Sequence, residues 1–383
     1  MSRRPVPVAH VVTRLDLGGA QQNTLHTVSH LDPARFAPSL FCGSGGFLDR
    51  DASGLGVKAF WIEDLVREIS PSQDLRAFFE LYSRLREESP EVVHTHSSKA
   101  GILGRLAAWL AGVPVIIHTF HGFGFHEGQP LKGALVALER LAAGVCTRLV
   151  FVSKANMRLA ARLGIGREPQ YRLIRSGVSL SRFPAKADRG AKRSELGLPR
   201  DCLLVLGVGN LKLQKNAGDF LAVASAVARR VPQACFAYVG DGPMRGPLEA
   251  AAAEQGLVGR LKFCGWRRDV GELLAAADVF LLTSLWEGLP RALVEAMKSG
   301  LPCAAYPVDG IEDVLVDGVT GLTAPVRDTG RLASAVERLL LDPGLRRSLG
   351  EKARASIGME FDIDEMVRQQ ERLYEECLSE KKN

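Results

Sequence analysis

Short apolar runs alternate with longer amphipathic stretches along most of this chain of 383 residues. The short runs are rich in Val, Ile, Leu and Phe and are followed by Gly, Ser or His, which is typical of buried strands. In the first half, strands are expected at 5–12, 39–43, 57–62, 92–96, 113–121, 148–153 and 171–178. Amphipathic helices are expected between them, for example at 74–88 and 99–111. This alternation predicts βαβ units around a mainly parallel sheet.

A charged segment that is poor in apolar residues, 184–200, interrupts the pattern and has a proline near each end. We predict that it is a linker between two domains. The alternation then restarts, with strands expected at 202–209, 234–240, 261–266, 279–284, 302–307 and 322–325. A charged helix is expected at 362–378, with Met366, Leu373 and Tyr374 on or near one face.

The chain is therefore predicted to be an α/β protein with two tandem, doubly wound, Rossmann-like domains. The expected parts are a first domain at 1–183, the linker at 184–200, a second domain at 201–360 and a C-terminal helical segment at 361–383. Ligands of open α/β sheets bind beyond the carboxyl ends of the strands. An active site is accordingly expected in a cleft between the two sheets.

Composition narrows the class of protein. An apolar content of 46% and a charged content of 24% are those of a soluble globular protein, and no run approaches ~18 uninterrupted apolar residues. The seven cysteines are scattered without C-x-x-C spacing, so we expect buried free thiols rather than disulfides or a zinc site. We expect a cytoplasmic protein, either free or at the inner face of the plasma membrane.

The net charge of +6 comes from the first half, where residues 1–185 hold 22 Lys and Arg against 15 Asp and Glu. A first half with this excess of positive charge suits a diphosphate ligand or an anionic membrane surface, although an ordinary solvated surface fits the charge equally well. One helix places aromatic residues beside arginines: Phe78, Phe79 and Tyr82 with Arg76, Arg84 and Arg86. A core role for these aromatics is favoured over membrane contact.

The stretch EGLPRALVE carries two glutamates eight positions apart, Glu287 before an expected helix and Glu295 within it. Pro290 fits the first helical turn, and the amides near Gly288 and Leu289 would lie at a helix N-terminus that favours an anion. Carboxylates could accept hydrogen bonds from sugar and ribose hydroxyls while the amides hold phosphate. A capping glutamate plus a surface glutamate is an equally good interpretation of this pair alone.

Three other places carry candidate chemistry. Lys215 follows a strand and a glycine turn in GVGNLKLQK, where its ammonium could pair with a diphosphate, and a solvated lysine is the alternative. Gly18 and Gly19, in TRLDLGGAQ, would let the backbone approach a ligand, or simply form a turn. His121, in TFHGFGFH, ends a strand at the edge where ligands bind, and a structural histidine is the alternative.

Together these motifs resemble the retaining family 4 glycosyltransferases of the two-domain GT-B type, including members that build bacterial capsular and exopolysaccharides. Matching stretches cover both halves in the family's order: TRLDLGGAQ, HTHSSKAGILGRLAAWLAGVP, HTFHGFGF, FVSKA, GVGNLKLQK, YVGDGPMR, FCGWRRDV, SLWEGLPRALVEAMKSGLP and DGVTGL. Each stretch alone is a weak signal, whereas the ordered set is highly specific. The resemblance also implies a C-terminal helix that crosses back to the first domain.

The resemblance implies a metal-independent, retaining hexosyltransferase without a cofactor. It would move a hexosyl or N-acetylhexosaminyl group in the synthesis of a cell-surface polysaccharide or glycoconjugate. Its donor would be a nucleotide-diphosphate sugar, with UDP expected rather than GDP, and its acceptor a glycan or a polyprenyl-diphosphate-linked sugar. No nucleic-acid partner is expected.

The implied roles follow the motif positions. Glu287 and His121 would bind the donor sugar, Lys215 its diphosphate and Glu295 the ribose. The expected catalytic residues are His121, Glu287 and Lys215. Gly288 and Leu289 would offer amides to the donor, and Gly18 and Gly19 would line the diphosphate or acceptor side.

One position departs from the family pattern. Many members carry arginine where this chain has Asn210, so one guanidinium fork towards phosphate is missing. Lys212 could substitute as a point charge, or Asn210 could itself donate to phosphate or sugar. The departure bears on donor affinity more than on the type of reaction.

Other functions fit less well. An NAD-dependent enzyme is disfavoured because GVGNLK has lysine where the third glycine of G-x-G-x-x-G belongs. A UDP-sugar 2-epimerase, or a non-catalytic protein that binds sugar nucleotides on the same fold, remain alternatives. His94 and His96 lie on one side of a strand, but without a third ligand nearby in sequence we expect hydrogen bonding rather than metal binding.

Overall fold

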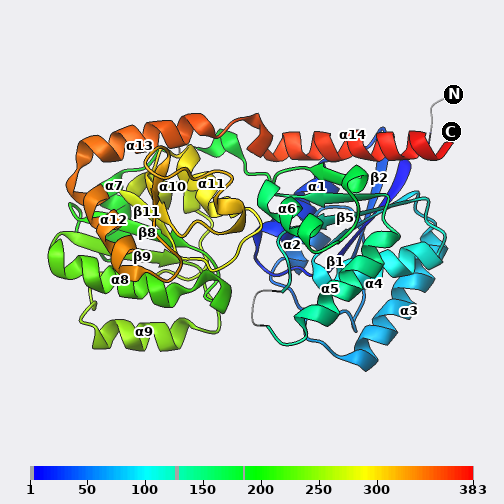
Figure 1. Cartoon of the computed structure of the whole chain (residues 1–383), viewed down its shortest axis with the longest axis horizontal. Helices are drawn as coiled ribbons and strands as arrows, with labels where there is room; N and C mark the ends of the chain where they lie inside the picture. Colours follow the sequence, from blue (N-terminus) through cyan, green and yellow to red (C-terminus); the bar gives the residue numbers. More distant parts are fainter. Residues whose placement is uncertain (1–3, 126–128, 184–185, 383) are drawn as a thin grey trace. The chain divides into compact units, whose positions relative to one another are not determined.

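A computed structural model describes residues 4–125, 129–183 and 186–382. The chain folds into two compact units (Figure 1). The first unit comprises Met1–Gly177 together with Ile363–Asn383, and the second comprises Val178–Asp362.

The first unit is built on a seven-stranded sheet in the order β3-β2-β1-β4-β5-β6-β7, with parallel pairing throughout. Its strands are β1 (Val6–Arg14), β2 (Phe36–Gly43), β3 (Lys58–Trp61), β4 (Val92–His96), β5 (Val115–Phe120), β6 (Arg148–Phe151) and β7 (Tyr171–Leu173). Its helices are α1 (Gly19–His30), α2 (Asp49–Ser53), α3 (Pro71–Glu88), α4 (Ser98–Leu110), α5 (Lys132–Gly144), α6 (Lys154–Arg162) and α14 (Ile363–Lys382).

The second unit repeats this design on six parallel strands in the order β10-β9-β8-β11-β12-β13. The strands are β8 (Leu203–Val208), β9 (Ala234–Val239), β10 (Leu261–Phe263), β11 (Val279–Leu282), β12 (Cys303–Ala305) and β13 (Gly321–Thr323). The helices are α7 (Arg189–Glu195), α8 (Ala217–Arg230), α9 (Arg245–Glu254), α10 (Val270–Ala276), α11 (Arg291–Lys298), α12 (Thr329–Leu341) and α13 (Pro343–Ser356). The predicted pair of doubly wound, parallel α/β domains is confirmed.

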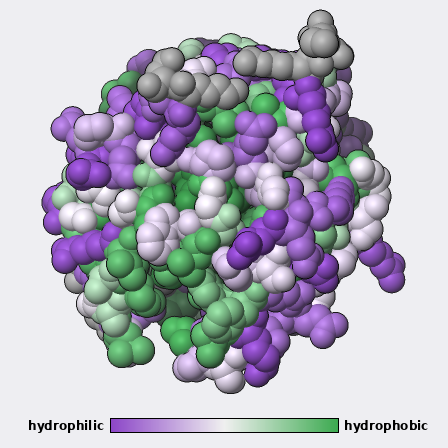
Figure 2. All heavy atoms as spheres, turned by 90° about the vertical axis from the view of Figure 1, so that its right-hand side faces the viewer, coloured by the Kyte–Doolittle hydropathy of each residue, from purple (hydrophilic) through white to green (hydrophobic). Residues whose placement is uncertain are grey.

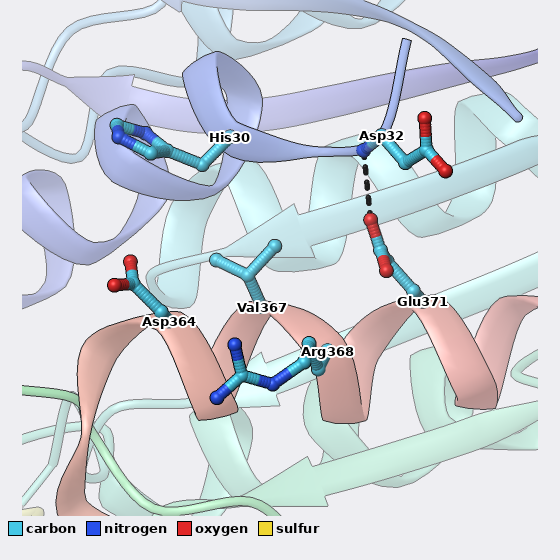
Figure 3. A pocket seen from close by; sticks show the side chains of 6 residues that line it. All are labelled: His30, Asp32, Asp364, Val367, Arg368 and Glu371. Carbon is cyan, nitrogen blue, oxygen red and sulfur yellow. Dashed lines mark hydrogen bonds between the residues drawn. The ribbon is translucent and has the colours of Figure 1, made fainter. Parts of the chain in front are cut away.

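The C-terminal helix α14 belongs to the first unit, as predicted. Met366 and Tyr374 are buried in the apolar cluster that also contains residues of β1, β4 and β5. Along its polar side, Glu371 accepts a hydrogen bond of 2.8 Å from the backbone N–H of Asp32, which follows α1 (Figure 3). Apolar burial and polar pairing therefore both fix this helix to the first unit.

The structure differs from the predicted linker. Within 184–200, Arg189–Glu195 form α7, which is part of the second unit and packs against α10. Asp188 caps α7, and Arg193 is buried in a 2.8 Å ion pair with Asp278. The segment resembles a linker in sequence because Arg193, although buried, counts as a charged residue like its exposed neighbours. The boundary between the two units falls instead between Gly177 and Val178.

Two further expectations concern cysteines and membrane spans. All seven cysteines are unpaired and six of them are buried, as the scattered spacing predicts. Among the described residues, no helix combines the length and the apolar character that crossing a bilayer requires.

Candidate active site

In the second unit, three neighbouring strands deliver candidate residues to one edge of the sheet. β8 and β12 both pair with β11 in parallel, so the carboxyl ends of the three strands lie side by side. The chain segments that leave β8, β11 and β12 carry Lys215, Glu287 and Asp309, respectively. The topology thus gathers one cation and two carboxylates where open α/β sheets bind their ligands.

Lys215 and Glu287 form an ion pair in which the Glu287 side chain is only 6% exposed. The segments around them are tied together: Thr283 Oγ1 donates to the backbone oxygen of Lys215 at 3.1 Å, and Gln214 Nε2 donates to that of Trp286 at 2.9 Å. These hydrogen bonds fix the two backbone segments that carry Lys215 and Glu287 relative to each other.

Helix α11 follows Glu287 directly. It begins at Arg291, with Pro290 as its extended N-cap residue, so the proline lies one position before the predicted first turn. The helix has no side-chain cap, which leaves the positive end of its dipole available to an anion. Gly288 and Leu289 are buried in the segment between Glu287 and this helix end.

Glu295 lies inside α11, as predicted, with its side chain 16% exposed. Arg291 approaches it to only 3.7 Å, and burial raises the pKa of the Glu295 carboxyl. A buried carboxylate whose ion pair to Arg291 is as long as 3.7 Å is suited to accept hydrogen bonds from hydroxyl groups.

The turn after β8 brings backbone close to Lys215. A Cβ added at Gly209 would lie 3.2 Å from side-chain carbons of Lys215, so a larger residue would crowd the path of the lysine side chain. Asn210 and Lys212 are partly exposed in the same turn. The structure therefore places Asn210 in the turn next to Lys215.

The first unit gathers its own candidates at the carboxyl ends of β1, β4 and β5, which are adjacent and parallel. Gly18 is the N-cap residue of α1 and Gly19 is its first residue; this helix end also lacks a side-chain cap. His121 directly follows β5. Ser97, after β4, has a φ of 62° and its hydroxyl lies 2.7 Å from that of Thr13.

A chain of buried imidazoles leads to His121. His10 Nδ1 lies 3.1 Å from His96 Nε2, and His96 Nδ1 lies 3.2 Å from His121 Nε2. His94 bonds the Tyr374 hydroxyl at 2.6 Å and that of Thr119 at 2.7 Å. Burial lowers the pKa of His10 to about 3 and that of His121 to about 4, so both rings are neutral at pH 7.

No metal site is expected from the sequence, yet three of the buried histidines lie close enough together to hold a metal ion. Ligand atoms of His10, His94 and His96 all lie within 4.8 Å of one another, so β1 supplies the third histidine that is not close in sequence. However, both nitrogens of His94 and of His96 already have hydrogen-bond partners. The geometry describes a hydrogen-bonded array, in line with the role expected for His94 and His96.

Sequence reasoning missed Asp309, Ser97 and His10. Asp309 and His10 lie near predicted site residues only through sheet pairing and outside the matching stretches. Ser97 lies within the matching stretch HTHSSKAGILGRLAAWLAGVP, but no role is assigned to it from the sequence. The available signal was positional: Asp309 and Ser97 follow strands at the edge where candidates gather, and His10 pairs with His94 across β1 and β4.

Comparison with known proteins identifies the family. Residues 18–177 match the model of the glycosyl transferase 4-like domain, and residues 188–356 match that of the glycosyl transferases group 1. A UDP-Gal:α-D-GlcNAc-diphosphoundecaprenol α-1,3-galactosyltransferase of Escherichia coli is 34% identical over 375 residues, covering 96% of each chain.

Solved structures agree on the fold. A crystal structure of HepE of Anabaena in complex with UDP and glucose has a TM-score of 0.83 at 19% identity, covering 97% of this chain and 100% of the other. Sucrose-phosphate synthase of Thermosynechococcus elongatus has a TM-score of 0.82 at 21% identity, covering 98% and 99%. The fold, the motif series and the full-length similarity agree: the chain belongs to glycosyltransferase family 4 and is a GT-B glycosyltransferase.

Proposed function

We propose that this protein transfers a hexosyl group, with retention of anomeric configuration, from a UDP-sugar to a polyprenyl-diphosphate-linked sugar. The observation that carries the proposal is the Lys215–Glu287 pair beside the uncapped start of α11. A cation and a helix end without a side-chain cap suit a diphosphate, and a nearby carboxylate suits sugar hydroxyls.

From the ion pair we infer how the donor binds: each member of the pair exchanges its partner for a group of the donor. Without a ligand, Lys215 and Glu287 neutralise each other in a largely buried setting. The donor diphosphate would take over the ammonium of Lys215, and hydroxyls of the donor sugar would take over the Glu287 carboxylate. Lys215 would then keep an anionic partner and Glu287 would keep hydrogen-bond donors, so neither buried charge is left unsatisfied.

We further propose that the reaction needs neither a metal ion nor a cofactor. Negative charge builds on the departing diphosphate as the bond between sugar and phosphate breaks. Lys215 and the amides at the start of α11 would stabilise that charge, which is the task that a divalent ion performs in other enzymes.

Retention is proposed to follow from attack on the same face. The bond from the anomeric carbon to the diphosphate breaks, and the acceptor hydroxyl oxygen bonds that carbon from the same side. A phosphate oxygen of the leaving UDP takes the hydroxyl proton, so charge and atoms balance without a protein nucleophile. Isolation of a glycosyl-enzyme adduct on a side chain would overturn this step.

Relatives support the choice of substrates. The Escherichia coli relative is named for transfer from UDP-galactose to GlcNAc-diphosphoundecaprenol, and HepE was crystallised with UDP and glucose. UDP-galactose is therefore the first donor to test, and a polyprenyl-diphosphate-linked GlcNAc the first acceptor.

Such an acceptor requires access to a membrane, and we propose that the first unit provides it from the cytoplasmic side. Apolar side chains gather low on the face of this unit shown in Figure 2. Large apolar residues of α3, α4 and α5 are exposed, among them Leu75, Phe79, Trp109, Leu110, Leu138 and Leu141. Phe78 and Tyr82 instead pack partly against the core, as favoured from the sequence. For Phe79 the favoured core role is wrong, because this residue is 57% exposed on α3. Phe79→Asp should weaken binding to anionic vesicles, and unchanged binding would contradict this surface.

The decisive experiment measures UDP release from several UDP-sugars in EDTA, with and without polyprenyl-diphosphate-GlcNAc. Acceptor-dependent release from one donor, lost in Glu287→Gln and Lys215→Met, is expected. Glu337→Gln is the matched control, because Glu337 forms a surface ion pair with Arg230 in the same unit. Tight UDP binding without transfer would favour the non-catalytic alternative, and interconversion of UDP-sugars would favour the epimerase.

A further inference from the structure

Asp309 holds the backbone of Glu287. The N–H of Glu287 donates a 2.9 Å hydrogen bond to Asp309 Oδ2. Asp309 lies beyond the end of β12 and Glu287 beyond the end of the neighbouring β11. The bond thus ties together two loops that leave adjacent strands at the edge where the candidate site lies.

The backbone of Asp309 is in an unusual conformation. Its φ is 43°, in the left-handed region where a residue with a Cβ is strained and glycine is not. Aspartate tolerates this region better than most residues, yet glycine would fit with less strain. The position therefore carries a side chain against the local backbone preference.

Charge does not explain the choice of aspartate. Asp309 is partly buried, and the nearby carboxylates of Glu287 and Glu312 repel a third negative charge. Among the effects that act on its carboxyl group, the Glu287 amide is the one that favours the ionised form. The favourable contact that offsets burial, repulsion and backbone strain is thus the bond to Glu287.

We propose that Asp309 is a positioning residue that fixes the Glu287 loop, so that the Glu287 carboxylate faces Lys215 and the donor. The proposal rests on the proposed function, in which Glu287 binds the donor sugar. A loop anchored on one side by Asp309 and on the other by the Lys215 pair has little freedom to carry the carboxylate out of place. Displacement of such a group by ~1 Å is enough to slow a reaction ~100-fold.

Two variants of Asp309 separate positioning from a general structural role. Asp309→Gly removes the hydrogen-bond acceptor and also relieves the left-handed strain, so the fold should keep its thermal stability. We expect kcat to fall ~10- to 100-fold while the Kd for UDP changes less than about threefold. Asp309→Asn keeps an oxygen that accepts from the Glu287 N–H and should restore kcat to within about fivefold of the unsubstituted protein.

A control tests the backbone effect alone. Ser89, at the end of α3 in the first unit, has a φ of 45°, close to that of Asp309. Ser89→Gly relieves the same kind of strain far from Glu287 in sequence and should leave kcat unchanged. Full activity of Asp309→Gly, or an equal loss of kcat and UDP affinity, would overturn the proposal.

Amide hydrogen exchange tests the contact without any substrate. A peptide that contains Glu287 should exchange faster in Asp309→Gly, and its protection should return in Asp309→Asn. Unchanged exchange in Asp309→Gly would overturn the positioning role even in a protein that transfers no sugar. Faster exchange in a protein without transferase activity would instead place the failure on the proposed function.

Discussion

Lys215 and Glu287 belong to loops that leave the neighbouring strands β8 and β11, and their side chains meet as an ion pair. The two residues are 72 positions apart in the sequence, and the pairing of β8 with β11 brings them together. Its members are 18% and 6% exposed, so each charge depends on the other for its stabilisation.

This dependence predicts coupled effects on stability. Lys215→Met leaves the Glu287 carboxylate buried without its cation and should lower the free energy of unfolding by about 1–3 kcal/mol. The double variant Lys215→Met with Glu287→Gln should recover part of that loss. Urea unfolding of both single variants and the double variant measures the coupling, and additive losses would contradict it.

Glu295 gives a prediction on nucleotide recognition. If its carboxylate accepts from the ribose, Glu295→Ala should weaken UDP binding about tenfold, equivalent to ~1.4 kcal/mol. The same variant should bind UDP and its 2′,3′-dideoxy analogue with similar Kd, whereas the unsubstituted protein should prefer UDP. Calorimetry measures both ligands, and a preference that survives in Glu295→Ala would exclude this role. Glu351→Ala, on the exposed side of α13, is the control.

Replacing Asn210 by arginine is expected to raise the affinity for UDP. Asn210→Arg would supply the guanidinium fork that is missing from the turn beside Lys215, and should tighten UDP binding by a few-fold to about tenfold. The gain should shrink at high salt and be absent for uridine, which has no diphosphate. An equal gain for uridine would show that the new side chain does not act on phosphate.

Because the first unit contains buried histidines, we expect its stability towards unfolding to fall at acid pH. Their pKa is lowered by burial, for His10 from 6.5 to about 3, so folding favours the neutral ring. The contribution to stability is complete above pH 6.5 and is lost as the pH falls towards 3. Each histidine adds a slope of up to ~1.4 kcal/mol per pH unit within that window. Denaturant unfolding of His10→Asn between pH 7 and 4.5 should show a shallower slope, and an unchanged slope would contradict this.

The sequence predicts the larger features because they rest on short-range patterns. Alternating apolar and amphipathic stretches identify βαβ units, and the Glu287–Glu295 spacing correctly places one carboxylate before α11 and the other inside it. The sequence also predicts burial of Met366 and Tyr374 from the periodicity of one helix face. In each case the deciding information lies within about two helical turns of chain.

What the sequence does not reveal depends on distant partners. Segment 184–200 is predicted to be a linker because the buried role of Arg193 becomes visible only beside Asp278. Asp309 is unremarkable until β12 is placed next to β11 and the Glu287 amide meets its carboxylate. Likewise, His10 joins His96 only through the pairing of β1 with β4.

The return of α14 to the first unit also fixes an order of assembly. A ribosome finishes every residue of Val178–Asp362 before it makes the helix whose Met366 and Tyr374 complete the apolar core of the first unit. The second unit is one continuous segment and can fold as soon as it emerges, whereas the first must wait with part of its core uncovered. The part of the chain that is made first is therefore the part whose folding is completed last.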